Sequence, residues 1–131
     1  MAESTAIPDI QIVTADQAEN VVFDWGQLTW YADHKLGNSE EMTVGRCVLK
    51  PGCGNPRHYH PNCSEILVVV QGQIRHTSAE GKETELMQGD TVTIPRNVWH
   101  CAVNIGREDA ILFIAFSSAE RLTVGEEPPA K

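Results

Sequence analysis

Residues 52–72 read GCGNPRHYHPNCSEILVVVQG and place His58, His60 and Glu65 close together in the chain. Side chains two positions apart on an extended strand point to the same face, so the two histidines can reach one point in space. A third histidine, His100, follows forty residues after His60. Imidazole nitrogens and one carboxylate oxygen form a donor set that suits divalent transition metals. The four residues therefore predict a site for one such ion: Fe, Mn, Zn, Ni, Co or Cu.

A second block of sequence supplies His100. Residues 89–104 read GDTVTIPRNVWHCAVN. Together the two blocks resemble the two signature motifs of the cupin superfamily, and nine of the ten defining positions hold the residue that the family has. The exception is Asn97, where the family usually has a glycine that turns the chain with a positive φ. Asparagine is the non-glycine residue that tolerates a positive φ best, so we expect the same turn at Asn97.

The resemblance implies a small single-domain cupin with an all-β fold, the double-stranded β-helix or jelly-roll barrel. The pattern of the chain agrees, because many short strands separated by turn signals are typical of a β-sandwich or barrel. We expect strands over residues 10–14, 21–25, 28–32, 42–49, 65–71, 73–77, 83–87, 91–95, 98–104 and 110–116. Residues 1–9 are expected to form a flexible arm and residues 10–124 the single barrel domain. Residues 125–131 are charged and proline-rich, which predicts a disordered tail.

Composition limits the classes of binding partner and the cellular compartment that we expect for this protein. A chain of 131 residues with a net charge of −8 is one domain and lacks the basic surface that nucleic acids and anionic membranes require. It has no run of eighteen apolar residues and no signal-peptide pattern at its start, so we expect no membrane span and no secretion. Its four cysteines form no C-x-x-C pair. We therefore expect free thiols and a cytoplasmic location.

The strand that begins at Glu65 predicts an association between subunits. If Glu65 faces the barrel interior, Leu67 and Val69 face it too, and the residues between them face outward. Both sets are apolar, and a strand that is apolar on both faces needs cover on both faces. Small single-domain cupins, which this chain resembles, pair as dimers. We therefore expect a homodimer.

Strand parity and side-chain chemistry select the expected pocket residues: Leu67, Val69, Val98, Ala102, Arg46 and Arg75. The four aliphatic side chains would surround the metal with an apolar wall, where little water competes with its charge. Either arginine could hold a carboxylate or a phosphate through two parallel hydrogen bonds. The candidate catalytic bases are Glu65 and His76.

Three functions are compatible with such a centre. The favoured one is Lewis-acid catalysis on a small polar metabolite, in which the metal polarises a carbonyl and a base removes the α-proton, as in isomerases, epimerases and lyases. The first alternative is an Fe(II)-dependent dioxygenase. The second is a non-catalytic protein that binds or senses a small molecule. Fold class does not choose among them.

Overall fold

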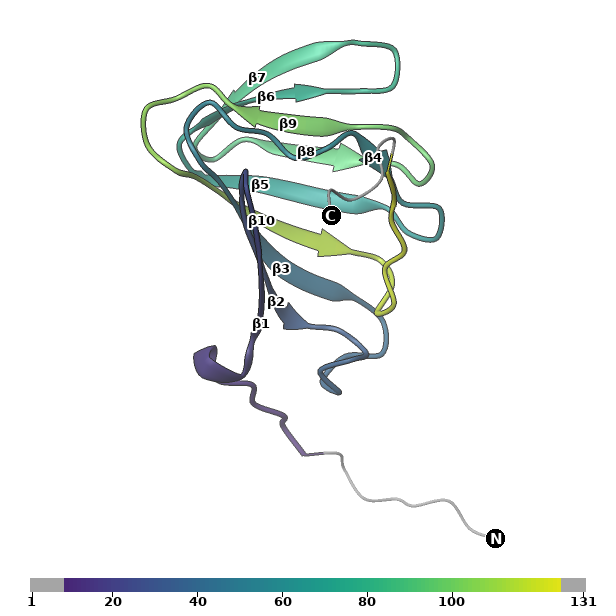
Figure 1. The fold of residues 1–131 in the computed structure, drawn as a ribbon. Coiled ribbons are helices and arrows are strands. Elements are labelled where there is room, and N and C mark those ends of the chain that lie inside the picture. Colours follow the sequence, from purple (N-terminus) through teal and green to yellow (C-terminus); the bar gives the residue numbers. More distant parts are fainter. Residues whose placement is uncertain (1–8, 126–131) are drawn as a thin grey trace, which may run out of the picture.

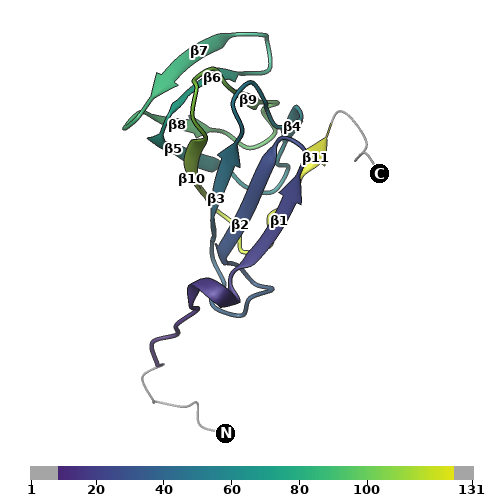
Figure 2. The same cartoon turned by 60° about the vertical axis from the view of Figure 1, so that its left-hand side comes forward.

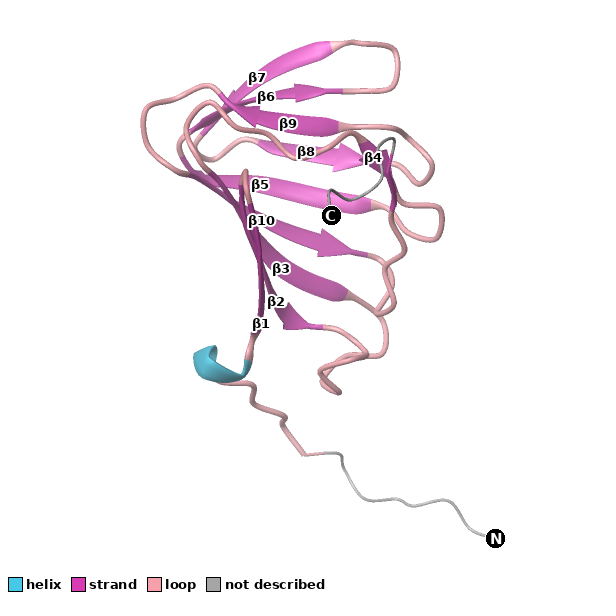
Figure 3. Ribbon diagram, in the orientation of Figure 1, coloured by secondary structure: helices cyan, strands magenta, loops and turns pink. Residues whose placement is uncertain are grey.

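The computed structural model describes residues 9–125, and these residues are almost entirely β structure (Figures 1 and 3). The elements are the 3₁₀ helix η1 (Ala15–Gln17) and the strands β1 (Glu19–Phe23), β2 (Gly26–Ala32), β3 (Thr43–Leu49), β4 (His58–Tyr59), β5 (Glu65–Gln71), β6 (Gln73–Thr77), β7 (Glu83–Met87), β8 (Thr91–Ile94), β9 (Cys101–Asn104), β10 (Ala110–Phe116) and β11 (Val124–Gly125). The all-β prediction is confirmed. Within this described part of the chain, no helix is long and apolar enough to cross a membrane.

Three antiparallel sheets build the molecule. The largest has six strands in the order β1-β2-β3-β10-β5-β8, and the smaller two have the orders β7-β6-β9 and β11-β4. Figure 1 shows the strands stacked from β1 and β2 at one end to β6 and β7 at the other, and Figure 2 shows how they curl around an interior. Strand β10 lies between β3 and β5, both far from it in sequence. Such long crossovers are typical of a jelly roll.

Alternating burial along the central strands defines the interior. Glu65, Leu67 and Val69 of β5 are 5%, 5% and 1% exposed, which confirms the predicted parity of this strand. In the β5–β10 register, Phe116 lies opposite Glu65. The inward side chains of β3, β5 and β10 share one hydrophobic core: Cys47, Leu49, Leu67, Val69, Leu112, Ile114 and Phe116. The glutamate therefore enters the barrel from a strand that apolar packing holds in place.

Three of the predicted strands differ clearly from the structure, and one of them, expected over residues 21–25, runs over Glu19–Phe23 instead. Residues 10–14 form no strand, and Ile10 and Ile12 are 90% and 78% exposed. The prediction was wrong because an alternating pattern makes a strand only where a neighbouring strand can pair with its backbone, and the described sheets offer this segment no partner. The strand expected over residues 98–104 is shortened to Cys101–Asn104. Val98 instead belongs to a turn in which its N–H donates to the carbonyl of Pro95 at 3.4 Å.

Two short strands were not predicted. Strands β4 and β11 pair with each other, with Val124 opposite Tyr59 and Gly125 opposite His58. Gly125, which the prediction placed in the tail, therefore belongs to a sheet. The pairing joins segments that are far apart in sequence, so neither carries a local signal. The remaining residues of the predicted arm and tail, 1–8 and 126–131, lie outside the described residues.

The turn at Asn97 links the two sequence blocks. Asn97 has φ 72°, which confirms the predicted positive φ, and its side chain is exposed. Its backbone N–H donates to the carbonyl of His60 at 3.0 Å. The left-handed turn in the second block thus holds the chain at the end of the H-x-H motif.

Comparing Asn97→Gly with Asn97→Ala should show whether a change in the free energy of unfolding comes from backbone strain or from loss of the asparagine side chain. Glycine adopts the left-handed conformation freely, so Asn97→Gly should leave the free energy of unfolding within about 0.5 kcal/mol, whereas Asn97→Ala should lower it by about 1 kcal/mol. Urea denaturation of both variants measures this, with Arg96→Ala, an exposed neighbour, as the control. Equal stability of the glycine and alanine variants would contradict the prediction.

Candidate metal centre

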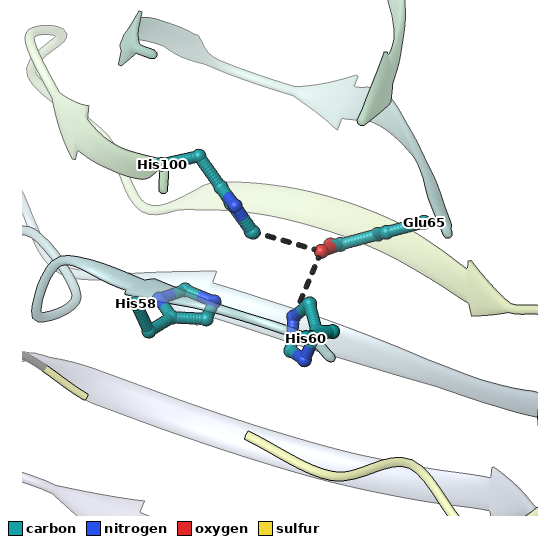
Figure 4. Close-up of side chains that lie close together, drawn as sticks. All are labelled: His58, His60, Glu65 and His100. Atoms are coloured by element: carbon teal, nitrogen blue, oxygen red, sulfur yellow. Dashed lines mark hydrogen bonds and ion pairs between the residues drawn. The ribbon is translucent and has the colours of Figure 1, made fainter. Parts of the chain in front are cut away.

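Four side chains from three parts of the chain converge inside the barrel (Figure 4). His58 and His60 come from β4 and the residue after it, Glu65 is the first residue of β5, and His100 directly precedes β9. Their potential ligand atoms all lie within 4.8 Å of one another. His60, Glu65 and His100 are buried, and His58 is half-buried. The structure therefore brings together the four residues that the sequence selected as metal ligands.

Backbone hydrogen bonds align the two motif blocks. His58 and His100 face each other across an isolated antiparallel bridge. The N–H of His58 donates to the carbonyl of His100 at 3.0 Å, and the N–H of His100 donates to the carbonyl of His58 at 2.8 Å. The imidazole centroids of this pair lie 4.3 Å apart. Residues forty-two positions apart are thereby held in register.

Each histidine is oriented by a backbone carbonyl at its Nδ1 atom. Nδ1 of His58 lies 2.7 Å from the carbonyl of Pro56, Nδ1 of His60 lies 2.9 Å from that of Leu122, and Nδ1 of His100 lies 2.9 Å from that of Val98. A carbonyl only accepts hydrogen bonds, so each Nδ1 carries the proton. The neutral tautomer then leaves the lone pair on Nε2, as in metal-binding histidines.

The Nε2 atoms meet the carboxylate of Glu65, and this arrangement fits a cation. Oε1 of Glu65 lies 3.1 Å from Nε2 of His100 and 3.3 Å from Nε2 of His60. With the protons on Nδ1, these buried atoms are all acceptors and would repel one another without a positive charge among them. Among residues 9–125, Nε2 of His60 finds no hydrogen-bond partner. A divalent ion satisfies all four groups, so the residues present fit a metal.

Shifted pKa values favour the protonation states that a metal requires. Burial, followed by the charge of His100, lowers the pKa of His58 to about 4. Burial raises the pKa of Glu65, but the neighbouring imidazoles of His100 and His60 together outweigh it and lower the value to about 2. Neutral imidazole and ionised carboxylate are the forms that bind metals. Near pH 7 the site therefore holds its ligands ready for an ion.

Three of the four predicted aliphatic pocket residues lie on the interior side of their strands, and the fourth, Val98, lies in a turn. Leu67, Val69 and Ala102 are buried on the interior side of their strands. Val98 is half-buried in the turn before His100, where its carbonyl orients that histidine. The contact of Val98 with the centre is therefore made by its backbone carbonyl.

His76, the candidate base, lies beside the centre. It is 6% exposed, and its ring stacks on that of His100 with centroids 5.8 Å apart and an interplanar angle of 18°. Nε2 of His76 is buried and has no hydrogen-bond partner among the described residues 9–125. Burial, followed by the charge of His100, lowers the pKa of His76 to about 4. A neutral, unsatisfied imidazole nitrogen is therefore available inside the barrel.

The two predicted pocket arginines do not lie beside the four ligands. Arg46 alternates with the buried Cys47 on β3, and its Nη2 atom lies 3.4 Å from the hydroxyl of Thr29. Arg75 alternates with the buried Ile74 and His76 on β6, and it forms long ion pairs of 3.9 and 4.0 Å with glutamates of β7. Both predictions selected arginines for their chemistry alone. Strand parity turns both side chains to the outer faces of their sheets.

The sequence did not predict that the segment after β10 contacts the ligand cluster. The segment after β10, residues 117–125, crosses back to β4 and contacts His60 twice, through the Leu122 carbonyl and through the Thr123 hydroxyl, which lies 3.2 Å from Nδ1. It also places the guanidinium of Arg121 over the ring of Trp30, with 4.3 Å from Cζ to the centroid. No local pattern predicts these contacts, because they join residues more than sixty positions apart.

Replacing single ligands should weaken metal binding without unfolding the protein. His58→Ala and His100→Ala should each raise the dissociation constant for Zn(II) or Mn(II) about tenfold or more, because each variant removes one ligand. Isothermal titration measures the affinity, and circular dichroism should show an unchanged β spectrum. His34→Ala, an exposed histidine outside the cluster, is the control. Unchanged metal stoichiometry and affinity in both ligand variants would exclude this assignment.

Comparisons with known proteins agree with this geometry. A family model described as "Cupin domain" matches residues 45–116. The chain is similar to a germin-like protein from Morus alba, with 34% identity, and to an auxin-binding protein from Prunus persica, with 38% identity, each over 85 residues. Each match covers 62% of this chain and 41% of the relative. The chain thus spans about two-fifths of the length of these relatives.

Solved structures show the same fold. The oxalate decarboxylase of Lactobacillus farciminis, in complex with formate, superposes with a TM-score of 0.78 at 21% identity, over 85% of this chain and 34% of that chain. The Bacillus subtilis oxalate decarboxylase at pH 4.6 gives a TM-score of 0.75 at 21% identity, over 82% of this chain and 29% of that chain. These likenesses confirm the predicted jelly-roll fold. Because the family model also matches more than half of the chain and includes all four ligands, the chain belongs to the cupin family.

Proposed function

We propose that this protein is a metal-dependent enzyme that acts on a small polar metabolite by chemistry of the isomerase, epimerase or lyase type. The observation that supports the proposal is the convergence of three imidazoles and one carboxylate within 4.8 Å. A bound divalent ion would supply Lewis-acid polarisation of a substrate carbonyl. His58, His60, Glu65 and His100 would hold that ion. Leu67 and the other aliphatic side chains would exclude water around it.

We expect the side chain of His76 to contact the substrate directly. Its unpartnered Nε2 atom and its stacking on His100 place a free polar group next to the ligand cluster. With a pKa of about 4 the ring is neutral near pH 7 and can accept a proton. The same low pKa weakens it as a base, so a hydrogen bond that orients the substrate would be the larger part of its role.

The similar proteins support Lewis-acid chemistry as the first candidate function and small-molecule binding without conversion as the second. The structures that the chain resembles are oxalate decarboxylases, among them the Bacillus subtilis enzyme with its Mn(II) centres. Decarboxylation, like removal of an α-proton, develops negative charge that a Lewis acid stabilises. The auxin-binding relative from Prunus persica favours the second candidate, a protein that binds a small organic molecule without converting it.

Hydrogen exchange in D₂O tests for catalysis without knowledge of the substrate. The metal-loaded protein should catalyse exchange of an α-hydrogen, or decarboxylation, in at least one member of a panel of 2-oxo acids, hydroxy acids and hydroxy ketones. Proton NMR detects both reactions. Removal of the metal with a chelator and His100→Ala should each abolish the signal, because both remove the polarising ion. His76→Gln should reduce it by about tenfold to a thousandfold while metal content stays unchanged.

Two outcomes would contradict the enzymatic proposal. If the purified protein carries near-stoichiometric metal and yet transforms no compound in the panel, the binding-protein candidate becomes the better one. If neither the purified nor the reconstituted protein retains a metal, the proposed chemistry has no centre on which to act.

We also propose that two copies of the chain associate through the outer face of the large sheet. Phe113, Ile66 and Val70 on this face are 49%, 47% and 40% exposed. Phe113 lies on β10 at the middle of the sheet, with Arg46 opposite it on β3 and Val68 on β5. An apolar face of this kind is costly in water and can cover itself when two copies meet about a two-fold axis. The residues that face the interior remain free for the metal.

Phe113→Glu should convert a dimer into a monomer, because it places a charge at the centre of the proposed contact. Light scattering after size exclusion, at micromolar concentration, measures the mass. Met87→Glu is the matched control, since Met87 is 58% exposed but belongs to the β7-β6-β9 sheet. A monomeric unmodified protein, or equal effects of both variants, would exclude this interface.

A further inference from the structure

The three ligand histidines differ in how far away their orienting carbonyl lies in the chain. His58 and His100 are each oriented by the carbonyl of the residue two positions before them. The carbonyl that orients His60 belongs to Leu122, sixty-two positions later. The first two contacts form within the motif blocks, whereas the third forms only when the 117–125 segment lies against the barrel (Figure 1). The orientation of His60 therefore depends on a distant part of the chain.

The side chain of Asn62 ties this segment to the loop that follows His60. Its Oδ1 atom accepts a hydrogen bond from the N–H of Leu122 at 3.0 Å, and its Nδ2 atom donates to the carbonyl of Glu120 at 2.9 Å. The residue whose N–H is bound here is also the residue whose carbonyl orients His60. Asn62 therefore fixes the position of that carbonyl.

Arg121 provides a second support for the segment. Its guanidinium stacks over Trp30 and Phe116, with Cζ 4.3 Å and 5.3 Å from the two ring centroids. The ring of Phe116 in turn contacts the ring of His60, with centroids 4.9 Å apart. Arg121 therefore packs the segment onto the barrel beside the ligand that the segment orients.

Little apolar burial holds the 117–125 segment in place. Leu122 and Val124, its largest aliphatic side chains, are 55% and 39% exposed. Ala119 is buried, but its side chain is a single methyl group. A region with few buried apolar contacts opens at a lower free energy than the core of the same protein. The segment can therefore open while the barrel stays folded.

A bound ion and a closed segment favour each other. When Nε2 of His60 binds an ion, the ring proton must stay on Nδ1, and this buried group needs the carbonyl of Leu122 as its acceptor. Without an ion, the proton can move to Nε2 and donate to Oε1 of Glu65, 3.3 Å away. Opening the segment is therefore more costly with an ion than without one, and such coupling is reciprocal.

We propose that the 117–125 segment is a latch on the metal centre: its closed position orients His60 for an ion, and a bound ion keeps the segment closed. Asn62 and Arg121 are positioning residues in this device, because they act on His60 through the segment. The inference rests on the metal-binding part of the proposed function. It does not depend on which reaction the centre catalyses.

Hydrogen–deuterium exchange of the full chain, followed by mass spectrometry with and without saturating Zn(II), measures closure of the latch. Zn(II) should slow exchange in peptides from residues 117–125 about tenfold or more, because the ion raises the cost of opening. Peptides from β7, which belongs to the β7-β6-β9 sheet, are the internal control and should change less than about twofold.

Variants of the two supports test the reverse direction of the coupling. Asn62→Ala and Arg121→Gln should each raise the dissociation constant for Zn(II) about threefold to tenfold, because each destabilises the closed segment. Asn38→Ala is the matched control, which should leave the affinity within about twofold, since Asn38 also bonds one backbone N–H and one carbonyl, but in the loop between β2 and β3.

Nitrogen-15 NMR of the imidazole rings adds a measurement that a general loss of stability would not change. In metal-free Asn62→Ala, the ring of His60 should lose its fixed Nδ1–H form, because the acceptor is no longer held beside it. His58 and His100 should keep theirs, because their carbonyls lie in their own motif blocks.

Two kinds of failure are distinguishable. Zn(II) binding without slower exchange in residues 117–125 would overturn the latch and leave the metal centre intact. Unchanged affinity in both Asn62→Ala and Arg121→Gln, or an equal loss in Asn38→Ala, would also overturn it. If the unmodified protein binds no Zn(II), the metal-based function fails, and the latch fails with it.

Discussion

Three backbone carbonyls hold the imidazoles so that each presents its Nε2 atom to the carboxylate of Glu65. This constraint gives the interior its chemical character. A buried carboxylate and three imidazole lone pairs are costly together unless a cation lies among them. The mutual backbone hydrogen bonds of His58 and His100 keep the two motif blocks in register. The turn at Asn97, with its bond to the His60 carbonyl, adds a second link between them. The site is thus an outcome of backbone pairing as much as of side-chain choice.

The segment after β10, residues 117–125, extends the centre beyond the residues that the family model matches. The family match ends at residue 116, yet His60 takes its orienting carbonyl from Leu122. Metal affinity and the position of this segment are therefore coupled, because moving Leu122 would free the His60 ring. The same segment carries Arg121, so the packing of its guanidinium on Trp30 and Phe116 and the orientation of a ligand histidine depend on one stretch of backbone.

The large sheet has two faces with different roles. Its inner face carries Glu65 and the apolar core, and its outer face carries Phe113 and Arg46. Alternation along a strand keeps these sets apart, so an arginine next in sequence to a core residue points away from the pocket. Association through the outer face would stabilise the sheet from which Glu65 projects without entering the interior. The oligomer and the metal centre can therefore change independently.

The ligand set, the all-β class, the inward parity of β5 and the turn at Asn97 were all predictable from the sequence. The parity of β5 and the turn at Asn97 depend on spacing along one strand or turn, which strand geometry converts directly into direction. His100 joined the ligand set because the second block resembles a family motif. The prediction placed Arg46 and Arg75 in the pocket because of their chemistry alone. Alternation along β3 and β6 turns both side chains outward. The missing strand at residues 10–14, the pairing of β4 with β11 and the contacts of Leu122 and Arg121 could only come from the tertiary structure. The contacts join segments that lie tens of residues apart in the chain, and the missing strand depends on whether a neighbouring strand is present to pair with it. The local sequence does not determine which distant segment will lie beside it.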